Sequence, residues 1–249
     1  MYLAEEFLRV HGLREGKAGD KSFVNVIFTS AGPSMFAIQY YSLALDALRK
    51  KRGIEADFKN ELIEVRGDKH EAVYKTPTGE VVRKFSMLHV TPPMTAPDFI
   101  ASSPLVDAGG FIDVDKYSGQ HTKYKNVFSL GDCSNLPTSK TAAAITAQAP
   151  VIVANIIHVM KGQSPTAAYS GYTSCPIITG KNELMLAEFT TPAYDDQIKE
   201  TFPGDSRVPR YAFAQLYKYV FPFAYWNFML KGNWYGASGP FEPNVEKKQ

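Results

Sequence analysis

The most constraining feature of the sequence is the stretch from Val127 to Ala144, where an apolar run ends at Gly131-Asp132 and small residues follow a short loop. The apolar run predicts a buried strand, and Thr141-Ala-Ala-Ala predicts the start of a helix. The first turn of a helix favours electron-rich or anionic groups, and an Asp at the end of a strand can accept hydrogen bonds from hydroxyls. This combination suits the second half of a flavin dinucleotide site. Taken alone, the stretch is also explained without a ligand, as a strand, a loop and a helix with a capping Asp.

The composition is that of a globular protein with one large domain or two modest ones. The 249 residues are 45% hydrophobic and 21% charged. The formal net charge of +2 favours neither nucleic acid nor strongly acidic partners, and we exclude nucleic acid as a partner. The two cysteines, Cys133 and Cys175, form no disulfide framework and suit a reducing compartment or a redox role. The five histidines lack metal-ligand spacing, so no metal site is expected.

The first part of the chain predicts a helix followed by a Rossmann-like unit. Leu3, Phe7 and Val10 have helical spacing, without a capping residue before them and without the pattern of a signal or transit peptide. A chain that starts inside a helix is expected to be a fragment. Next we predict a strand over 23–29, a helix over 35–51, a strand over 54–58, a meander over 62–65, 72–76 and 81–85, and a buried strand over 87–90.

This unit lacks the glycine fingerprint of a nucleotide site. After its first strand the chain has Gly32-Pro33, where Pro33 removes an amide donor, and Met35 and Phe36 occupy the space that a pyrophosphate needs. We therefore predict a nucleotide-binding shape that binds no nucleotide. A divergent NAD site is the alternative.

The region after residue 95 predicts strands around one long helix. A strand is expected over 111–114, and helical spacing continues to about Met160, with a bend at Pro150. Cys175 is expected in a loop between aromatic and β-branched residues. A strand over 182–189 and a polar, Pro-rich surface loop over 191–209 follow.

The segment from Tyr211 to Leu230 is almost entirely apolar or aromatic, with Pro222 in its middle. Its length approaches a bilayer span of roughly 20 residues. The aromatic content, the central proline and the flanking basic residues instead predict a segment lying in the membrane interface. The alternative is a pair of short helices packed on the protein's own core or on a dimer partner.

Three stretches, Val127–Ala144, Tyr169–Glu188 and Pro222–Trp234, resemble the C-terminal part of the mitochondrial-type sulfide:quinone oxidoreductase family, within the flavoprotein disulfide reductase superfamily. The resemblance covers essentially the whole chain. It implies an α/β, two-dinucleotide-binding-domain flavoprotein fold, here lacking the N-terminal FAD/ADP-binding βαβ unit. The implied segments are an interdomain helix (1–15), a second Rossmann-like domain without the fingerprint (16–95), the C-terminal part of the FAD-binding domain (96–190) and a membrane-associating aromatic tail (191–249).

The resemblance also implies roles for single residues. Gly131 and Asp132 would hold the ribityl part of FAD, and Lys140 and Thr141 would lie by the flavin's pyrimidine end. Cys175 matches the second of two redox cysteines that form a disulfide above the flavin, and it is expected to have a lowered pKa. Sulfide attacks that disulfide, one sulfur becomes a persulfide, and two electrons pass through the flavin to a quinone. Cys133 is expected to be a small buried residue and no redox partner.

The family further implies partners and a location. The partners are a ubiquinone-type quinone, a small sulfur acceptor such as sulfite or a thiol, and, as a candidate, a second copy of the chain in a homodimer. The location is the surface of the mitochondrial inner membrane, where the protein would be peripheral or monotopic. The residues that could contact the quinone are Tyr217, Lys218, Phe221, Phe223 and Trp226.

The family's first redox cysteine lies shortly before a helix like that of residues 1–6, so the chain is expected to start just after it and to bind FAD weakly or not at all by itself. Two alternatives remain: an enzyme resembling type II NADH:quinone oxidoreductase, and a non-catalytic, membrane-associated or dimerising fragment.

Overall fold

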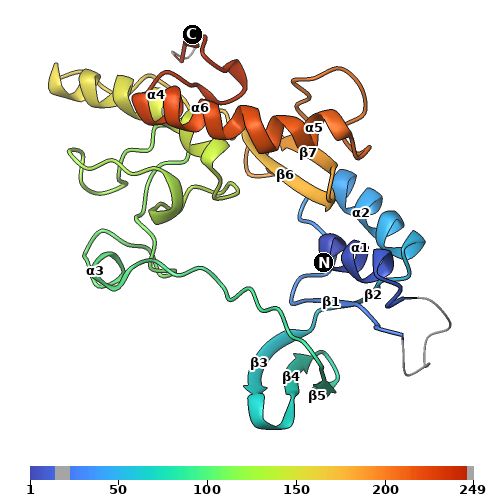
Figure 1. Ribbon diagram of the computed structural model, residues 1–249. Coiled ribbons are helices and arrows are strands. Elements are labelled where there is room, and N and C mark those ends of the chain that lie inside the picture. Colours follow the sequence, from blue (N-terminus) through green and yellow to red (C-terminus); the bar gives the residue numbers. More distant parts are fainter. Residues whose placement is uncertain (15–22, 246–249) are drawn as a thin grey trace. The chain divides into compact units, whose positions relative to one another are not determined.

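The computed structural model describes residues 1–14 and 23–245 and divides the chain into two units. The first unit comprises Met1–Pro93 together with the short segment Ile178–Lys181. The second comprises Met94–Ile177 and the chain from Asn182 onward. Figure 1 labels the helices and strands and colours the chain from its N-terminus to its C-terminus. The finer division into four segments stays a prediction.

The first unit contains the predicted strand–helix–strand. Strand β1 (Ile27–Ser30) pairs in parallel with β2 (Glu55–Phe58), and helix α2 (Gln39–Lys51) connects them. A parallel pair needs such a crossover because its strands run in the same direction. Helix α1 (Tyr2–Val10) is joined to α2 by the hydroxyl of Tyr2, which donates to the carbonyl of Leu45 at 2.7 Å.

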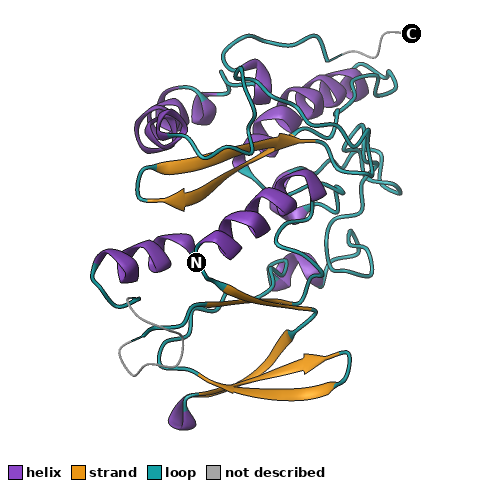
Figure 2. Ribbon diagram, turned by 90° about the vertical axis from the view of Figure 1, so that its right-hand side faces the viewer, coloured by secondary structure: helices purple, strands orange, loops and turns teal. Residues whose placement is uncertain are grey.

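The predicted meander is confirmed as a three-stranded antiparallel sheet, the lowest sheet in Figure 2. Strands β3 (Glu61–Arg66), β4 (Glu71–Thr76) and β5 (Gly79–Lys84) follow one another, with the turn η1 (Gly67–Lys69) between the first two. The central strand β4 buries Ala72, Val73 and Tyr74, while the outer strands are mostly exposed.

The helix predicted at the start of the chain is confirmed as α1. Two other expectations for the first unit are wrong. Residues 87–90 form no strand, because none of the described strands offers this apolar run a hydrogen-bonded neighbour, and Met87 is 85% exposed. Helix α2 begins at Gln39, four residues later than predicted. The apolar face of α1, with Leu3, Phe7 and Val10, is exposed, whereas Glu5 is buried.

The second unit is organised around the long helix α4 (Ala142–Met160), which was predicted and which contains Pro150. The hairpin of β6 (Thr173–Gly180) and β7 (Glu183–Phe189) follows. Strand β7 is buried from Leu184 to Phe189. Helix α3 (Asp98–Ala101) precedes these elements.

Two predicted strands of this unit are replaced by irregular chain. Residues 111–114 and the run 127–130 make only isolated bridges, such as Ile112 with Ser134 and Gln120 with Phe128. The run ends in a short 3-10 turn, η2 (Gly131–Cys133). These apolar runs are extended, but neighbouring segments pair with them at single residues and do not build a ladder.

The aromatic segment is helical. Helix α5 (Tyr211–Gln215), the π-helical segment η3 (Leu216–Val220) and helix α6 (Phe221–Asn227) follow one another directly. Two short turns, η4 (Met229–Lys231) and η5 (Gly236–Ser238), come after them. Helix α5 lies beside β7 (Figure 1).

Among the described residues, one helix, α4, is long and apolar enough to cross a membrane. This rests on length and composition alone, and core helices of soluble proteins pass the same test.

Candidate functional site

The start of α4 is shaped by Thr141. This residue has extended backbone angles (φ −132°, ψ 156°), and its hydroxyl accepts a hydrogen bond from the N–H of Ala144 at 3.1 Å. Such a cap satisfies one of the N–H groups that a helix cannot bond by itself. The next residue, Ala142, is exposed and lacks a bulky side chain. The helix start is therefore ordered, and its surface is open to a ligand.

The turn before this helix depends on Gly131. Its φ of +68° lies in the left-handed region, and a Cβ there would lie 3.2 Å from Cγ1 of Ile145 in α4. Its N–H donates to Oε1 of the buried Gln148 at 2.8 Å. Glycine suits this position because it adopts a positive φ readily and has no Cβ that would crowd Ile145. The turn leaves the carboxylate of Asp132 exposed.

Lys140 is a half-buried cation within electrostatic reach of Asp132. Its ammonium group donates to the carbonyl of Ser134 at 2.5 Å and lies over the ring of Phe111, 4.5 Å from the ring centre. Burial lowers the pKa of Lys140, and the negative charge of Asp132 opposes that shift. Phe111 was not predicted as a supporting residue, because its contact with Lys140 joins separate segments of the chain. Ser134 was not predicted either, because its bond to Lys140 depends on how the loop between them folds.

Cys175 lies in strand β6, so the predicted loop setting is wrong. The thiol is free, and burial raises its pKa. This is the reverse of the lowered pKa expected from the resemblance. The cause is burial, which disfavours the charged thiolate.

The structure brings the start of α4 and the strand of Cys175 together. The hydroxyls of Thr141 and Thr173 are 2.9 Å apart, and Thr173 is fully buried. Side chains two residues apart lie on the same face of a strand, about 7 Å apart. Cys175 therefore shares a face with Thr173, next to the helix start. Thr173 was not among the predicted site residues, because Cys175 was expected in a loop, where the alternation of side chains along a strand does not apply.

Cys133 is held within its own turn. Its sulfur lies 3.3 Å from the hydroxyl of Ser129 and donates to the carbonyl of Leu130 at 3.4 Å. The thiol is free and half-buried. Within the described residues, no group of three or more potential metal ligands is present.

The five residues named for quinone contact lie on the helical run of η3 and α6. Phe223 and Trp226 are 60% and 65% exposed, and Tyr217 is also exposed. The ammonium group of Lys218 donates to Oδ1 of Asn182, in the turn between β6 and β7, at 2.8 Å. The run is thereby linked to the hairpin that carries Cys175.

None of the five residues lines the cavity of about 480 Å³ that the second unit contains. That cavity lies between α4 and the end of the described chain, where its lining includes Ala147, Val151, Tyr172, Lys199, Tyr235 and Ser238.

Comparison with known proteins identifies similar curated proteins in three organisms, each named sulfide:quinone oxidoreductase, mitochondrial. The chain is 48% identical to that of Dictyostelium discoideum over 98% of its own length and 52% of the relative. The identity is 44% with that of Mus musculus, over 96% and 51% of the two chains, and 43% with that of Schizosaccharomyces pombe, over 98% and 53%. The chain spans about half the length of these relatives. No family model matches it.

Solved structures show the same fold. The sulfide:quinone oxidoreductase of Aquifex aeolicus matches with a TM-score of 0.67 and 18% identity, over 93% of this chain and 54% of that one. A chain in the mitochondrial ATP synthase structure of Tetrahymena thermophila matches with a TM-score of 0.72 and 23% identity, over 97% and 57%. The expected flavoprotein fold class is confirmed for the part that the chain spans. The chain is therefore a relative of the mitochondrial sulfide:quinone oxidoreductases, as its motifs indicated, and corresponds to about half of their length.

Proposed function

We propose that this chain provides the cysteine-bearing part of a flavin-dependent sulfide:quinone oxidoreductase. The observation that carries the proposal is the contact between Thr141 and Thr173, which joins the helix start to the strand of Cys175. The identity of 43–48% to curated relatives supports it. The proposed reaction oxidises sulfide by two electrons, reduces a ubiquinone-type quinone and passes the sulfur to a small acceptor such as sulfite or a thiol.

The residues near the start of α4 fit one end of FAD. The exposed carboxylate of Asp132, beside the tight turn at Gly131, can accept hydrogen bonds from ribityl hydroxyls. Lys140 and the N–H groups after Thr141 supply positive charge for an electron-rich ring. When bound, FAD supplies a two-electron acceptor that can pass electrons on to a quinone. The hydroxyl of Thr141 already bonds the N–H of Ala144 and the hydroxyl of Thr173. We therefore propose that the main chain of Thr141, and not its hydroxyl, contacts the flavin.

Cys175 is proposed as one end of a disulfide with a second cysteine. Sulfide attacks Cys175, the S–S bond breaks, Cys175 carries the persulfide, and the second cysteine leaves as a thiolate. Two observations support Cys175 as the cysteine that carries the persulfide. Burial raises the pKa of Cys175, which makes its sulfur the poorer leaving group. The alternative thiol, Cys133, is bonded within its own turn.

The acceptor then removes the outer sulfur from Cys175. The two thiolates that remain would give up one electron pair as their disulfide re-forms. That pair would pass to bound FAD and from there to the quinone, which is the final oxidant.

The aromatic run is proposed to lie in the membrane interface and to receive the quinone. Its exposed Tyr, Phe and Trp side chains suit the level of the lipid headgroups. Tyr217, Lys218, Phe221, Phe223 and Trp226 remain our candidates for quinone contact. The mitochondrial names of the relatives support a location at the inner membrane, with peripheral or monotopic attachment. A homodimer is a further part of this proposal.

The test uses the protein that carries this chain as isolated from its own cells, with the chain identified by mass spectrometry. We expect a visible flavin spectrum, and reduction of a soluble ubiquinone analogue by sulfide and not by NADH. Reduction by NADH alone would favour a type II NADH:quinone oxidoreductase. Absence of flavin would favour a non-catalytic, membrane-associated role.

A further inference from the structure

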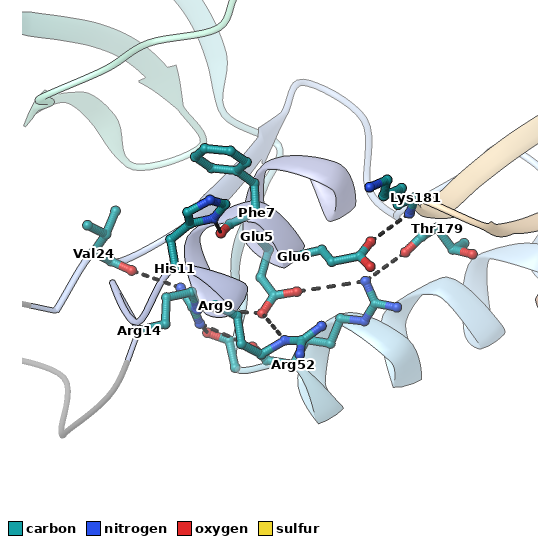
Figure 3. A network of polar contacts seen from close by, with 11 residues as sticks. Glu5, Glu6, Phe7, Arg9, His11, Arg14, Val24, Arg52, Thr179 and Lys181 are labelled. Atoms are coloured by element: carbon teal, nitrogen blue, oxygen red, sulfur yellow. Dashed lines mark hydrogen bonds and ion pairs between the residues drawn. The ribbon is translucent and has the colours of Figure 1, made fainter.

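The far end of the cysteine strand is bound by side chains of the first unit, to which residues 178–181 belong. Figure 3 shows the contacts. Nη1 of Arg52 donates to the carbonyl of Thr179 at 2.6 Å, and the N–H of Lys181 donates to Oε2 of Glu6 at 2.6 Å. Both bonds involve a charged side chain and are therefore stronger than neutral ones. Two main-chain positions, Thr179 near the end of β6 and Lys181 just after it, are thus fixed.

Arg52 is itself held in place. It follows the last residue of α2, and its guanidinium lies 5.6 Å from the ring centre of Tyr2 and 3.7 Å from Oε2 of Glu5. Glu5 is fully buried. Arg14 adds a second support, because its Nε lies 3.7 Å from Oε1 of Glu5 and its Nη2 donates to the carbonyls of Arg52 and Gly53 at 3.1 and 2.8 Å. The guanidinium of Arg52 therefore has little freedom to move.

Positive charges outnumber negative ones around Glu5. Three guanidiniums, those of Arg9, Arg14 and Arg52, surround the single carboxylate of Glu5. Oε2 of Glu5 is buried without a hydrogen bond. A buried ion pair is weak evidence for stability, because the loss of hydration offsets much of the attraction. A better-supported use of such a group is to select one arrangement of the chain. Here the arrangement includes the end of β6.

Cys175 lies between two fixed points of its strand. Thr173, at the start of the strand, is hydrogen-bonded to Thr141. Thr179 lies four residues after Cys175, about 13 Å further along an extended strand, and its carbonyl is hydrogen-bonded to Arg52. The three residues share one face because their positions differ by even numbers. Thr173 and Thr179 are both fully buried, and Cys175 is half-buried between them. A slip of one residue at either end would turn the thiol to the opposite face.

We propose that Arg52 and Glu6 position Cys175 by fixing the end of its strand. Neither residue touches the thiol, so both are positioning residues that act through Thr179 and Lys181. This inference rests on the proposed role of Cys175 as the redox cysteine. Its test needs neither sulfide nor flavin, so its failure is distinct from failure of the proposed function.

The experiment measures how fast iodoacetamide labels Cys175 in the full chain with Cys133→Ala, which leaves one thiol. Hydrogen exchange of a peptide covering 176–183 is measured in parallel. In Arg52→Met the loss of a charge-assisted bond is expected to speed labelling about tenfold and to speed exchange. Arg52→Lys keeps the charge and should restore labelling to within about threefold of the parent rate. Glu6→Gln should fall between these two variants.

The matched control is Arg9→Met, which removes a guanidinium from Glu5 without touching the strand. Its labelling rate should stay within about twofold of the parent rate, because surface ion pairs contribute little. The proposal is overturned if Arg52→Met labels at the parent rate, or if Arg9→Met accelerates labelling equally. If Arg52→Met does not fold, Glu6→Gln decides: unchanged labelling and exchange overturn the proposal.

Discussion

Replacing Thr141 by Val tests the contact on which the proposed site depends. The change keeps the shape of the side chain and removes its hydroxyl. Loss of the helix cap costs about 1 kcal/mol. Loss of the bond to Thr173 costs about 1 kcal/mol more, because the buried hydroxyl of Thr173 then keeps only the carbonyl of Ser139, at 3.4 Å. We expect the free energy of unfolding to fall by about 2 kcal/mol.

A double-mutant cycle separates the two terms. Thr173→Val leaves the helix cap of Thr141 in place. It removes the contact between the hydroxyls together with the long bond to the carbonyl of Ser139, and should cost about 1 kcal/mol. The double variant should lose less than the sum of the single variants by about 0.5–1 kcal/mol, since no buried hydroxyl is then left unpaired. Thr141→Ser keeps both bonds and is the control, with an expected cost below about 1 kcal/mol.

Urea unfolding, followed by circular dichroism, gives the free energy for each variant. Additivity of the two Val substitutions within about 0.3 kcal/mol would refute the reasoning. A cost below about 0.5 kcal/mol for Thr141→Val would refute it as well, because it would show that neither the cap nor the contact contributes.

Three further predictions concern other parts of the chain. Glu5→Gln should lower the free energy of unfolding by about 3 kcal/mol in urea, since it leaves buried guanidiniums uncompensated, whereas Arg9→Met should cost under about 1 kcal/mol. Because burial raises the pKa of Cys175, the folded state holds this proton more tightly than the unfolded state, so stability is full below a pH of about 8.5 and falls as the pH rises through the folded-state pKa. Cys175→Val should reduce that alkaline decline in the urea midpoint, and an unchanged decline would contradict the assignment. Phe223→Asp should weaken sedimentation with anionic liposomes about tenfold or more, while Met87→Asp, at an even more exposed apolar site in the first unit, should leave it unchanged.

Regular patterns in the sequence predicted the elements that depend on local spacing. The helical period of α4, the antiparallel meander and the parallel pair β1–β2 are all present. The prediction failed where an apolar run needed a partner. Residues 87–90 and 127–130 have the composition of buried strands, but a strand forms only where a second segment offers its hydrogen bonds, and that segment is not visible in a local window.

The motifs in the sequence also indicated which proteins the chain resembles, and curated relatives are 43–48% identical to it. The same motifs pointed to Gly131, Asp132, Lys140, Thr141 and Cys175 as site residues, which stays a prediction. Tertiary structure alone decided how these residues are supported. Thr141 meets Thr173 across 32 positions, and Arg52 meets Thr179 across 127. It also decided that α1 buries Glu5 and exposes its apolar face, and that burial raises the pKa of Cys175. The physical reason is the same in each case: hydrogen bonds, ion pairs and desolvation depend on which distant groups come close in space, whereas helical and strand periods depend on neighbours along the chain.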